Sequence, residues 1–586
     1  RMRNLLLRQE DHDSEMTVVR NELERGEDEP QDLLQKNIFA TAFLEHPYHH
    51  PVIGWRTDVE NEPVKRLRQF YDEFYWPNNA TLIVIGDIDA KQILEKVAQR
   101  FGNIPRSPQP FPNVYTQEPK QEGTRRFIVQ RGSDLPRVDI AFHTVKAKDK
   151  DDYVLDVIES VLGDETKKSS RLYKALVDSG LASEADSSNM AMKDPGLFDM
   201  TATANAQTKP EALEAALMAQ LEQLKTTPLT AQELERTKKS LLKRLKLAMS
   251  DPMGMANQVS EAVSAADWQY LARYPELVSK VSAADVQNAA RKYFIPSNMT
   301  VGYYLPASKP QAEPAPGPGP GNVAQPTDVE TNPADATRAV DGAQPGSPSA
   351  VATEPLPTAP KTSEPPRQDK VVGPKAGTPL GTASGVKVPP PSAKTGIGKF
   401  SARVSRFVLG NGLTLLVMPV RGTGTVAISS RVRAGQYFST PQNPELPDLL
   451  SDLLTAGSSG YSKELLAQKM EEMGTNLAFN DDDFWLGSTS EVVTEDVANF
   501  LPLLADTLKH PVFSDEELQK TKKIKVAGIK EEEVDTGSVA WNRFTQSWYK
   551  PRSCYYNKPF SGQIADIESI DVRQLQDFHN RHFVAA

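Results

Sequence analysis

The stretch Pro51–Pro77, PVIGWRTDVENEPVKRLRQFYDEFYWP, recurs near the other end of the chain. Aligned without gaps, it matches Pro559–Ala585, PFSGQIADIESIDVRQLQDFHNRHFVA, at a proline, a glycine, two acidic residues and three apolar residues. The apolar matches keep the i, i+3, i+6 spacing of one helical face, at Val64/Val572, Leu67/Leu575 and Phe70/Phe578. The repeat therefore predicts the same unit twice: a loop followed by an amphipathic helix.

A weaker copy of this unit lies between the two. Phe74–Thr81, FYWPNNAT, is similar to Tyr293–Thr300, YFIPSNMT. In both places we expect a helix to end before the proline, because proline disfavours helix in the residue before it. A strand should follow, over Leu82–Ile85 in the first copy and Val301–Leu305 in the second. The sequence thus predicts three related α/β units.

The segment between the second and third units differs in composition from both. It is rich in Pro, Ala, Gly, Thr and Ser, and no aromatic residue occurs between Tyr304 and Phe400. Such a sequence buries too little apolar surface to offset its ordering entropy, so we predict a disordered linker. The predicted division is a partial first domain at 1–115, a second domain at 116–306, the linker at 307–399 and a third domain at 400–586.

Local patterns predict an α+β fold, with helices covering one face of a mostly antiparallel sheet. Asn411–Gly412 within RFVLGNGLTLLVMP is a strong hairpin signal, and a strand, TVAISSRVRAG, and a helix, ELPDLLSDLLTAG, follow it. Ser282 and Asp285 have the spacing of a capping box at a helix start. Apolar stripes mark further helices over Asp151–Leu162, Lys209–Thr226 and Thr230–Met249.

Composition excludes several classes of protein. The formal net charge is −10 and no basic stripe alternates with aromatics, so nucleic acid is a poor candidate partner. No apolar run reaches the roughly 18–20 residues of a membrane span. The single cysteine, Cys554, rules out an internal disulfide and any zinc site built mainly from cysteine.

Carboxylates on one helix face are the first candidate functional groups. Read as a helix, SEMTVVRNELERGEDEP (14–30) places Glu15 and Glu22 two turns apart, with Val18 and Val19 between them. Taken alone, this pattern favours a solvated helix edge. The alternative is a buried pair, which would need a metal or another partner.

Histidines give no zinc motif on their own. No pair forms H-E-x-x-H or H-x-x-E-H, and His46, His49 and His50 lie in a proline-interrupted loop, HPYHHP, where nothing enforces ligand geometry. His579 and His582 fall where the first unit has Tyr71 and Phe74, which indicates ordinary helix positions. No G-x-S-x-G elbow, P-loop or dinucleotide fingerprint is present.

EMTVVRNELERGEDEP resembles the distal zinc-ligand helix of the insulinase/pitrilysin family, the zinc peptidases with an inverted H-x-x-E-H motif. HPYHHPVIG followed by FYWPNNATLIVIGDI resembles the end of the family's first domain. SSRLYKALVDSGLAS and SDPMGMANQVSEAVSAADWQYLARYP resemble its second domain, and FVLGNGLTLLVMP onward resembles the start of a third. The order of these segments is more specific than any one of them.

The resemblance implies a two-half zinc metalloendopeptidase with four related domains that enclose a peptide substrate in a clamshell. Glu22 would be a ligand of Zn²⁺, and Glu15 would be a supporting carboxylate beside the site. The H-x-x-E-H motif would lie upstream of Arg1, so we expect the 586-residue chain to be inactive alone.

In the third unit the resemblance implies a degenerate site. Asp448, Ser451 and Asp452 stand where the motif has His, Glu and His. Gapless matching places Lys523 and Lys530 at the positions of the two glutamates, and a charged lysine cannot bind zinc.

Partners and location are also expectations from the resemblance. They comprise a peptide or unfolded polypeptide substrate, a possible second peptidase-like subunit, no nucleic acid, no membrane span, and a bacterial periplasmic location. Two alternatives stay open: a non-catalytic scaffold or partner subunit of the same family, and an unrelated binding protein whose Pro-rich linker carries the function.

Overall fold

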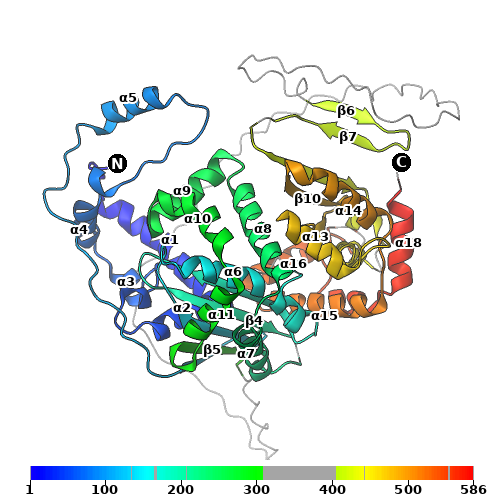
Figure 1. Ribbon diagram of the computed structural model, residues 1–586. Helices are drawn as coiled ribbons and strands as arrows, with labels where there is room; N and C mark the ends of the chain where they lie inside the picture. The colour runs from blue at the N-terminus through cyan, green and yellow to red at the C-terminus, as the bar shows by residue number, and fades with distance from the viewer. Residues whose placement is uncertain are drawn as a thin grey trace, which may run out of the picture. The chain divides into compact units, whose positions relative to one another are not determined.

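The computed structural model describes residues 2–132, 135–163, 168–205, 207–307, 404–420, 422–440, 443–551, 553 and 555–584 (Figure 1). The predicted disordered linker at 307–399 lies outside these residues except for Ala307. The described residues on its two sides belong to one compact unit, Arg1–Lys309 together with Arg403–Ala586.

The first part of the chain is helical. Its helices are α1 (Gln9–Asp28), α2 (Pro30–Ala42), α3 (Arg56–Asn61), α4 (Val64–Phe74) and α5 (Ala90–Phe101), with short turns at Pro47–His49 and Pro77–Asn79. The strand expected over Leu82–Ile85 is wrong: these residues pair with no strand among the described ones. Leu82 and Val84 are 59% and 43% exposed, since an extended segment without a neighbouring strand has neither ladder bonds nor a packed face.

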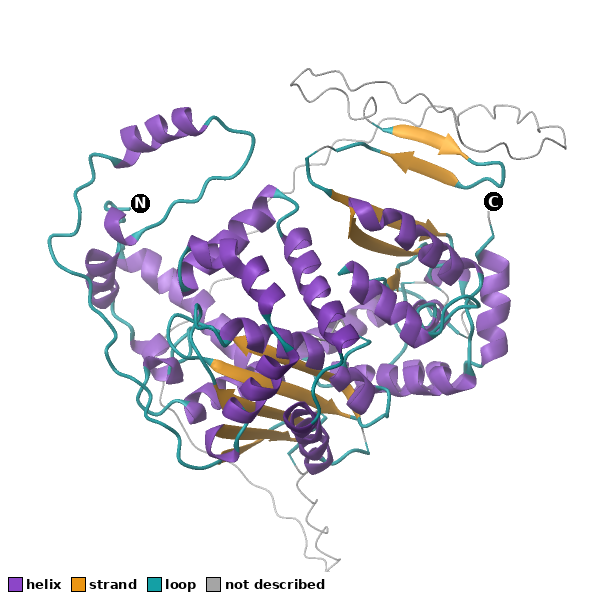
Figure 2. Cartoon of the chain, in the orientation of Figure 1, coloured by secondary structure: helices purple, strands orange, loops and turns teal. Residues whose placement is uncertain are grey.

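A five-stranded sheet organises the second part, in the order β1–β5–β2–β4–β3 (Figure 2). β1 and β5 pair in parallel and the other neighbours are antiparallel. The expected strand Val301–Leu305 is confirmed as part of β5. The strands are β1 (Arg125–Gln130), β2 (Arg137–His143), β3 (Ala182–Met190), β4 (Leu197–Ala204) and β5 (Met299–Leu305).

Helices cover both faces of this sheet. On one face Val138, Ile140 and Phe142 of β2 join the main core with α6 (Asp152–Leu162), α7 (Pro210–Thr226) and α11 (Ala283–Tyr293). On the other face Ala141 packs with α2. The α+β class is therefore confirmed, while the expectation of a single covered face is wrong, because β2 is buried on both sides.

Three further helices and a turn complete the second part. They are α8 (Ala231–Ala248), α9 (Pro252–Ala265), α10 (Trp268–Lys280) and a π-helical turn at Tyr173–Val177. The Ser282–Asp285 capping box at the start of α11 is present as predicted.

The third part begins with the predicted hairpin and continues with a second sheet. The hairpin strands are β6 (Ser405–Val408) and β7 (Thr414–Val417), and Gly412 has φ +89° in the turn. The antiparallel sheet β8–β10–β9 consists of β8 (Thr425–Val432), β9 (Phe479–Asp481) and β10 (Leu486–Val493). Its helices are α12 (Leu446–Leu453), α13 (Lys463–Met473), α14 (Val497–Lys509), α15 (Asp515–Glu532), α16 (Thr536–Trp548), α17 (Phe560–Ser569) and α18 (Val572–His582).

The internal repeat holds at the level of whole helices. The shift that aligns Pro51 with Pro559 carries α4 onto α18 residue for residue, from Val64–Phe74 to Val572–His582. The shift that aligns Pro77 with Pro296 carries α4 onto α11, and the turn after α4 onto the turn Pro296–Asn298. The repeated helix is therefore a structural unit of all three parts.

Helix α8 of the second part packs against α13 of the third. Helix α13 ends at Gly474, which has φ +63°. A Cβ at Gly474 would lie 2.5 Å from the Cβ of Lys243 and 3.2 Å from the backbone nitrogen of Arg244, so the two helices meet with no room for a side chain.

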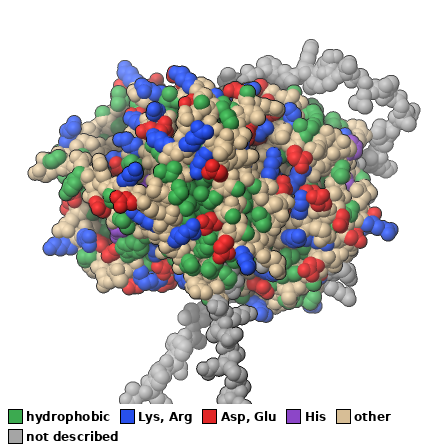
Figure 3. Space-filling view, turned by 60° about the horizontal axis from the view of Figure 1, so that its bottom comes forward, with side chains coloured by type: hydrophobic (Ala, Val, Ile, Leu, Met, Phe, Trp, Pro, Cys, Tyr) green, Lys and Arg blue, Asp and Glu red, His purple; other side chains and the backbone are tan. Residues whose placement is uncertain are grey.

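Acidic and basic side chains are interspersed over the face drawn in Figure 3. None of the helices in the described ranges is both long and apolar enough to cross a membrane.

Candidate functional site

Helix α1 presents the two candidate carboxylates. Glu15 and Glu22 are both exposed, and Val18 between them is 57% exposed. The structure gives neither glutamate a hydrogen bond or an ion pair with any residue in the described ranges. The roles predicted for Glu15 and Glu22 stay predictions.

The adjoining side of α1 is fixed to its neighbours. Leu23 is buried, and Glu27 accepts hydrogen bonds from Arg56 of α3 at 2.6 Å and Lys36 of α2 at 3.1 Å. The hydrogen bond from Arg56 holds the pKa of Glu27 below its usual value, so this carboxylate stays ionised. The helix therefore has one anchored side and one open side, and Glu15 and Glu22 lie on the open side.

The side chains of the histidine-rich loop pack against neighbouring residues. His46 is buried, its ring lies 3.6 Å from the carboxylate of Asp194, and its backbone N–H donates to Glu118. His49 contacts the carbonyl oxygen of His46 at 3.0 Å. Within the part of the chain that the structure describes, no three His, Cys, Asp or Glu side chains gather in a group that could hold a metal ion.

The third part contains a different cluster at the position of the predicted degenerate site. Asp448 and Asp452 lie one turn apart on α12, and both face the ammonium of Lys525 on α15. Its Nζ lies 2.7 Å from Asp448 Oδ1 and 3.1 Å from Asp452 Oδ2. Ser451 is buried and donates its hydroxyl to the carbonyl oxygen of Asp448 at 2.8 Å.

Lys523 and Lys530 are both exposed, as Glu15 and Glu22 are, so their exposure does not test the gapless placement. The face of α15 that approaches α12 carries Lys525 and Glu532, seven residues apart, as Glu15 and Glu22 are on α1. A register two residues further along therefore fits the contacts. Because Lys523 and Lys530 are also seven residues apart, the spacing alone does not distinguish the two registers in the sequence.

Burial and nearby charges shift the pKa values of several groups around α12 and α15. Burial raises the pKa of Glu445 to about 7 and the pKa of Asp481 to about 6, and the charge of Asp448 adds to both. Burial and Asp448 also raise the pKa of Glu532. Burial opposes the charge of Lys525, but the carboxylates of Asp452 and Asp448 outweigh this effect and raise its pKa.

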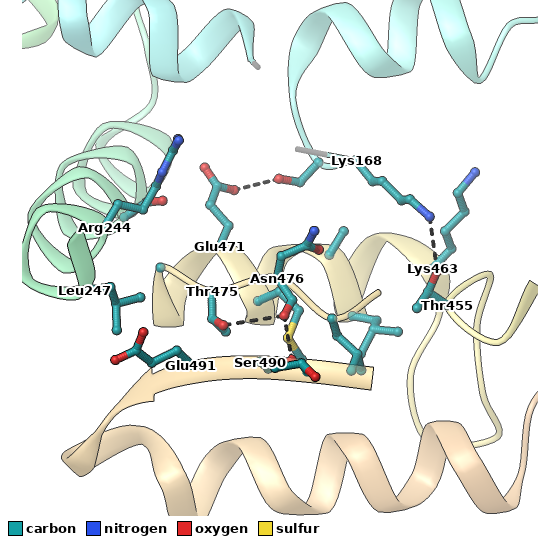
Figure 4. A pocket seen from close by; sticks show the side chains of 18 residues that line it. Lys168, Arg244, Leu247, Thr455, Lys463, Glu471, Thr475, Asn476, Ser490 and Glu491 are labelled. Atoms are coloured by element: carbon teal, nitrogen blue, oxygen red, sulfur yellow. Dashed lines mark hydrogen bonds between the residues drawn. The ribbon is translucent and has the colours of Figure 1, made fainter. Parts of the chain in front are cut away.

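A cavity of about 310 Å³ lies where α8 meets α13 (Figure 4). The polar groups at its rim bond to one another across this contact. Ser169 donates to Glu471 at 2.8 Å, Arg236 pairs with the same carboxylate at 2.8 Å, and Lys168 donates to Thr455 at 3.1 Å. These bonds join the second and third parts, and the cavity is a feature of their contact.

A row of acids, two of them buried and one half-buried, crosses the five-stranded sheet on the side of α2. Asp139 of β2 and Asp186 of β3 both align with Thr201 of β4, and Asp199 lies two residues from Thr201. Thr201 donates its hydroxyl to Asp186. Burial, reinforced by Asp186, raises the pKa of Asp199 to about 8, and burial raises the pKa of Asp139 well above its usual value.

Comparisons with known proteins agree with this architecture. A family model described as the Peptidase M16 inactive domain matches residues 63–241. The zinc protease PqqE of Helicobacter pylori is 30% identical over 309 residues, which cover 52% of this chain and 69% of that protein. The zinc protease YmxG of Bacillus subtilis is 23% identical over 236 residues, which cover 40% of this chain and 56% of that protein.

A crystal structure of a protease from Helicobacter pylori matches the fold with a TM-score of 0.50 and 30% identity. The match covers 52% of this chain and 74% of that one. This similarity excludes the alternative of an unrelated binding protein. The resemblance in the ordered segments, the α+β fold and the relatives at 30% identity lead to one conclusion: this chain belongs to the M16 family of zinc peptidases, the insulinase/pitrilysin type.

Proposed function

We propose that this chain is part of a zinc-dependent metalloendopeptidase, in which α1 supplies Glu22 as one metal ligand and Glu15 as a supporting carboxylate. The observation that carries the proposal is the open face of α1. It holds two carboxylates two turns apart around the exposed Val18, while Glu27 and Leu23 anchor the other side. A carboxylate with no partner of its own is available as a metal ligand.

The described residues do not form a zinc centre by themselves. Catalytic zinc takes about three protein ligands, and α1 offers Glu22 with no histidine beside it. The remaining ligands would come from outside this sequence, so the chain alone should neither hold Zn²⁺ tightly nor cleave peptides. The substrate would be a peptide or unfolded polypeptide, and the periplasmic location stays a prediction.

A non-catalytic role is the second candidate. The family model that matches residues 63–241 is that of the inactive domain, and α12 and α15 carry an ion-pair cluster where a metal site would lie. These observations favour a scaffold role for the second and third parts. They are compatible with a peptidase whose metal lies only in the first domain.

Metal analysis tests the proposal. The isolated 586-residue chain, dialysed against a chelator and then against Zn²⁺, should retain well under one zinc ion per chain by plasma mass spectrometry. Tight stoichiometric binding to this chain would contradict the predicted division of the ligands.

A longer polypeptide that carries the predicted H-x-x-E-H motif provides the second arm. There Glu22→Gln should lower both the zinc content and the rate of peptide cleavage, the rate by about 10²-fold or more. Glu15→Gln should have a smaller effect, and Glu10→Gln, an exposed glutamate in the first turn of α1, should have none. Unchanged zinc content in Glu22→Gln would exclude Glu22 as a ligand.

A further inference from the structure

Helix α16 turns its aromatic side outward and its polar side inward. Its aromatic side chains are 61%, 46% and 72% exposed at Trp541, Phe544 and Trp548. On the inner side Asn542 and Thr545 are buried, and Asn542 donates a hydrogen bond to a backbone carbonyl oxygen at 3.0 Å. This is the reverse of an ordinary surface helix, whose apolar side faces the core.

The three rings form one continuous surface. The ring of Phe544 lies 5.5 Å from that of Trp541 and 5.8 Å from that of Trp548, with 23° and 16° between the ring planes. A fully buried aromatic side chain covers about 150–250 Å², so the three together still expose about 300–400 Å². This is the size of the largest apolar patch on a typical monomer, and such patches are often contact sites.

Helix α2 has the same place in the first part, and there the apolar side is covered. It follows α1 as α16 follows α15, and both helices are 13 residues long. Counted from the first residue of each helix, Phe544 corresponds to Ile38 and Trp548 to Ala42. Ile38 and Ala42 are buried, and so is Leu34 one turn earlier on the same side. The apolar side that is covered in α2 is therefore uncovered in α16.

The outer face of the five-stranded sheet covers α2. Ala141 of β2 and Leu197 of β4 share a buried cluster with the helix. At Gly302 of β5 a Cβ would lie 3.0 Å from the Cδ1 of Leu34, so the strand backbone itself approaches the helix. The helix of one part is thus covered by the sheet of the next part along the chain, at positions that include small residues.

We propose that the aromatic side of α16 is the docking surface for the β-sheet of a further unit of the same repeat, carried by the same polypeptide. That sheet would cover α16 as the five-stranded sheet covers α2. Because the rings of Phe544 and Trp548 are larger than the isoleucine and alanine at these places in α2, the docking strands should present glycine or alanine to them. The sheet that covers α2 begins at Arg125, and a sheet at the same spacing after α16 lies beyond residue 586.

The inference rests on the proposal that this chain is part of a longer peptidase, and not on the role of Glu22. The two can fail separately, because zinc content tests Glu22 and the solvent access of two tryptophans tests α16.

The experiment compares the 586-residue chain with a longer polypeptide that continues past residue 586, by hydroxyl-radical labelling and mass spectrometry. Trp541 and Trp548 should be labelled about fivefold or more slowly in the longer polypeptide, because aromatic side chains at the centre of a contact are shielded from solvent. Trp268, which is 61% exposed on α10, should be labelled equally in both. Equal labelling of Trp541 and Trp548 in the two proteins overturns the proposal.

A substitution on the same side tests the docking itself. Phe544→Glu should restore the labelling of Trp548 in the longer polypeptide, because a carboxylate is costly to bury under a sheet. Trp268→Glu is the matched control and should leave Trp548 protected. Continued protection of Trp548 in Phe544→Glu contradicts docking on this side.

The 586-residue chain alone distinguishes a second copy as the occupant. Labelling of Trp541 and Trp548 should not depend on the concentration of this chain. Protection that rises with concentration would show that α16 is covered by a second copy of the chain, and it would overturn the proposal.

Discussion

At the scale of single residues, the buried acids of the five-stranded sheet control the pH dependence of stability. Asp139 and Asp199 are buried on neighbouring strands, and burial together with the half-buried Asp186 on the next strand disfavours their ionised forms. The sequence did not predict them, because Asp199 in the strand LFDMTATA reads as an ordinary polar position. Only the pairing of β2, β4 and β3 brings these carboxyl groups together.

Asp199→Asn should stabilise the protein at alkaline pH. The pKa of Asp199 is about 8 when folded and about 3.9 when unfolded, so the folded state binds the extra proton between these values. Its stability therefore falls as the pH rises from about 4 to about 8, by at most about 1.4 kcal/mol per pH unit. The variant lacks this carboxyl group and does not lose stability in this way. Its denaturant midpoint should therefore exceed that of the wild type by more at pH 8.5 than at pH 5.

Asp87→Asn is the matched control, because Asp87 is an exposed carboxylate and its removal should leave the midpoint unchanged at both pH values. An equal shift for Asp199→Asn at both pH values would show that Asp199 is ionised in the folded protein.

At the scale of secondary structure elements, α8 joins the second and third parts through charged side chains. Lys243 pairs with Asp496 and also donates to the carbonyl oxygen of Glu472 at 2.7 Å. Arg236, two turns earlier, pairs with Glu471, and Lys246, one turn later, pairs with Glu495 at 3.1 Å. One side of α8 is thus complementary in charge to α13 and the start of α14.

Lys243→Glu should weaken this contact, because it places a carboxylate against Asp496 and against a carbonyl oxygen. Hydrogen exchange in residues 472–475 and 494–498 should accelerate by about tenfold or more, which corresponds to about 1.4 kcal/mol. The swap Lys243→Glu, Asp496→Lys should restore much of the protection. Lys239→Glu, an exposed position one turn earlier on α8, should not change the exchange.

The elements also show what the sequence can predict. Apolar spacing and the position of prolines predicted α4, α11 and α18 well, because these signals lie within one helix and its cap. The strand over Leu82–Ile85 failed because a strand depends on a neighbour that no local pattern specifies. No local pattern fixes the register of α15 for a related reason: both Lys523 and Lys525 suit a helix, and only the packing of α12 against Lys525 distinguishes them.

At the scale of the whole molecule, the contact of α8 with α13 and α14 makes the connecting segment dispensable for association. A chain cut within residues 308–403 should elute as one species in gel filtration at low salt, because Arg236, Lys243 and Lys246 keep their partners. In about 1 M NaCl, where the Debye length is about 3 Å, the exposed pair Lys246–Glu495 is screened but the partly buried pairs of Arg236 and Lys243 are screened much less, so the affinity should fall by less than about tenfold. Separation at low salt would mean that the connection itself holds the two pieces together.

At Gly474 the second and third parts approach so closely that only the hydrogen side chain of glycine fits between α13 and α8. Any side chain at this position would act as a wedge, since its first carbon would overlap the stem of Lys243 and the backbone of α8. Long side chains at this contact can change conformation when a charge changes, but the backbone cannot make room for a methyl group at Gly474. The contact between the two parts thus tolerates changes in charge better than the addition of one methyl group. A family member with a residue other than glycine here would need a different tilt between these helices.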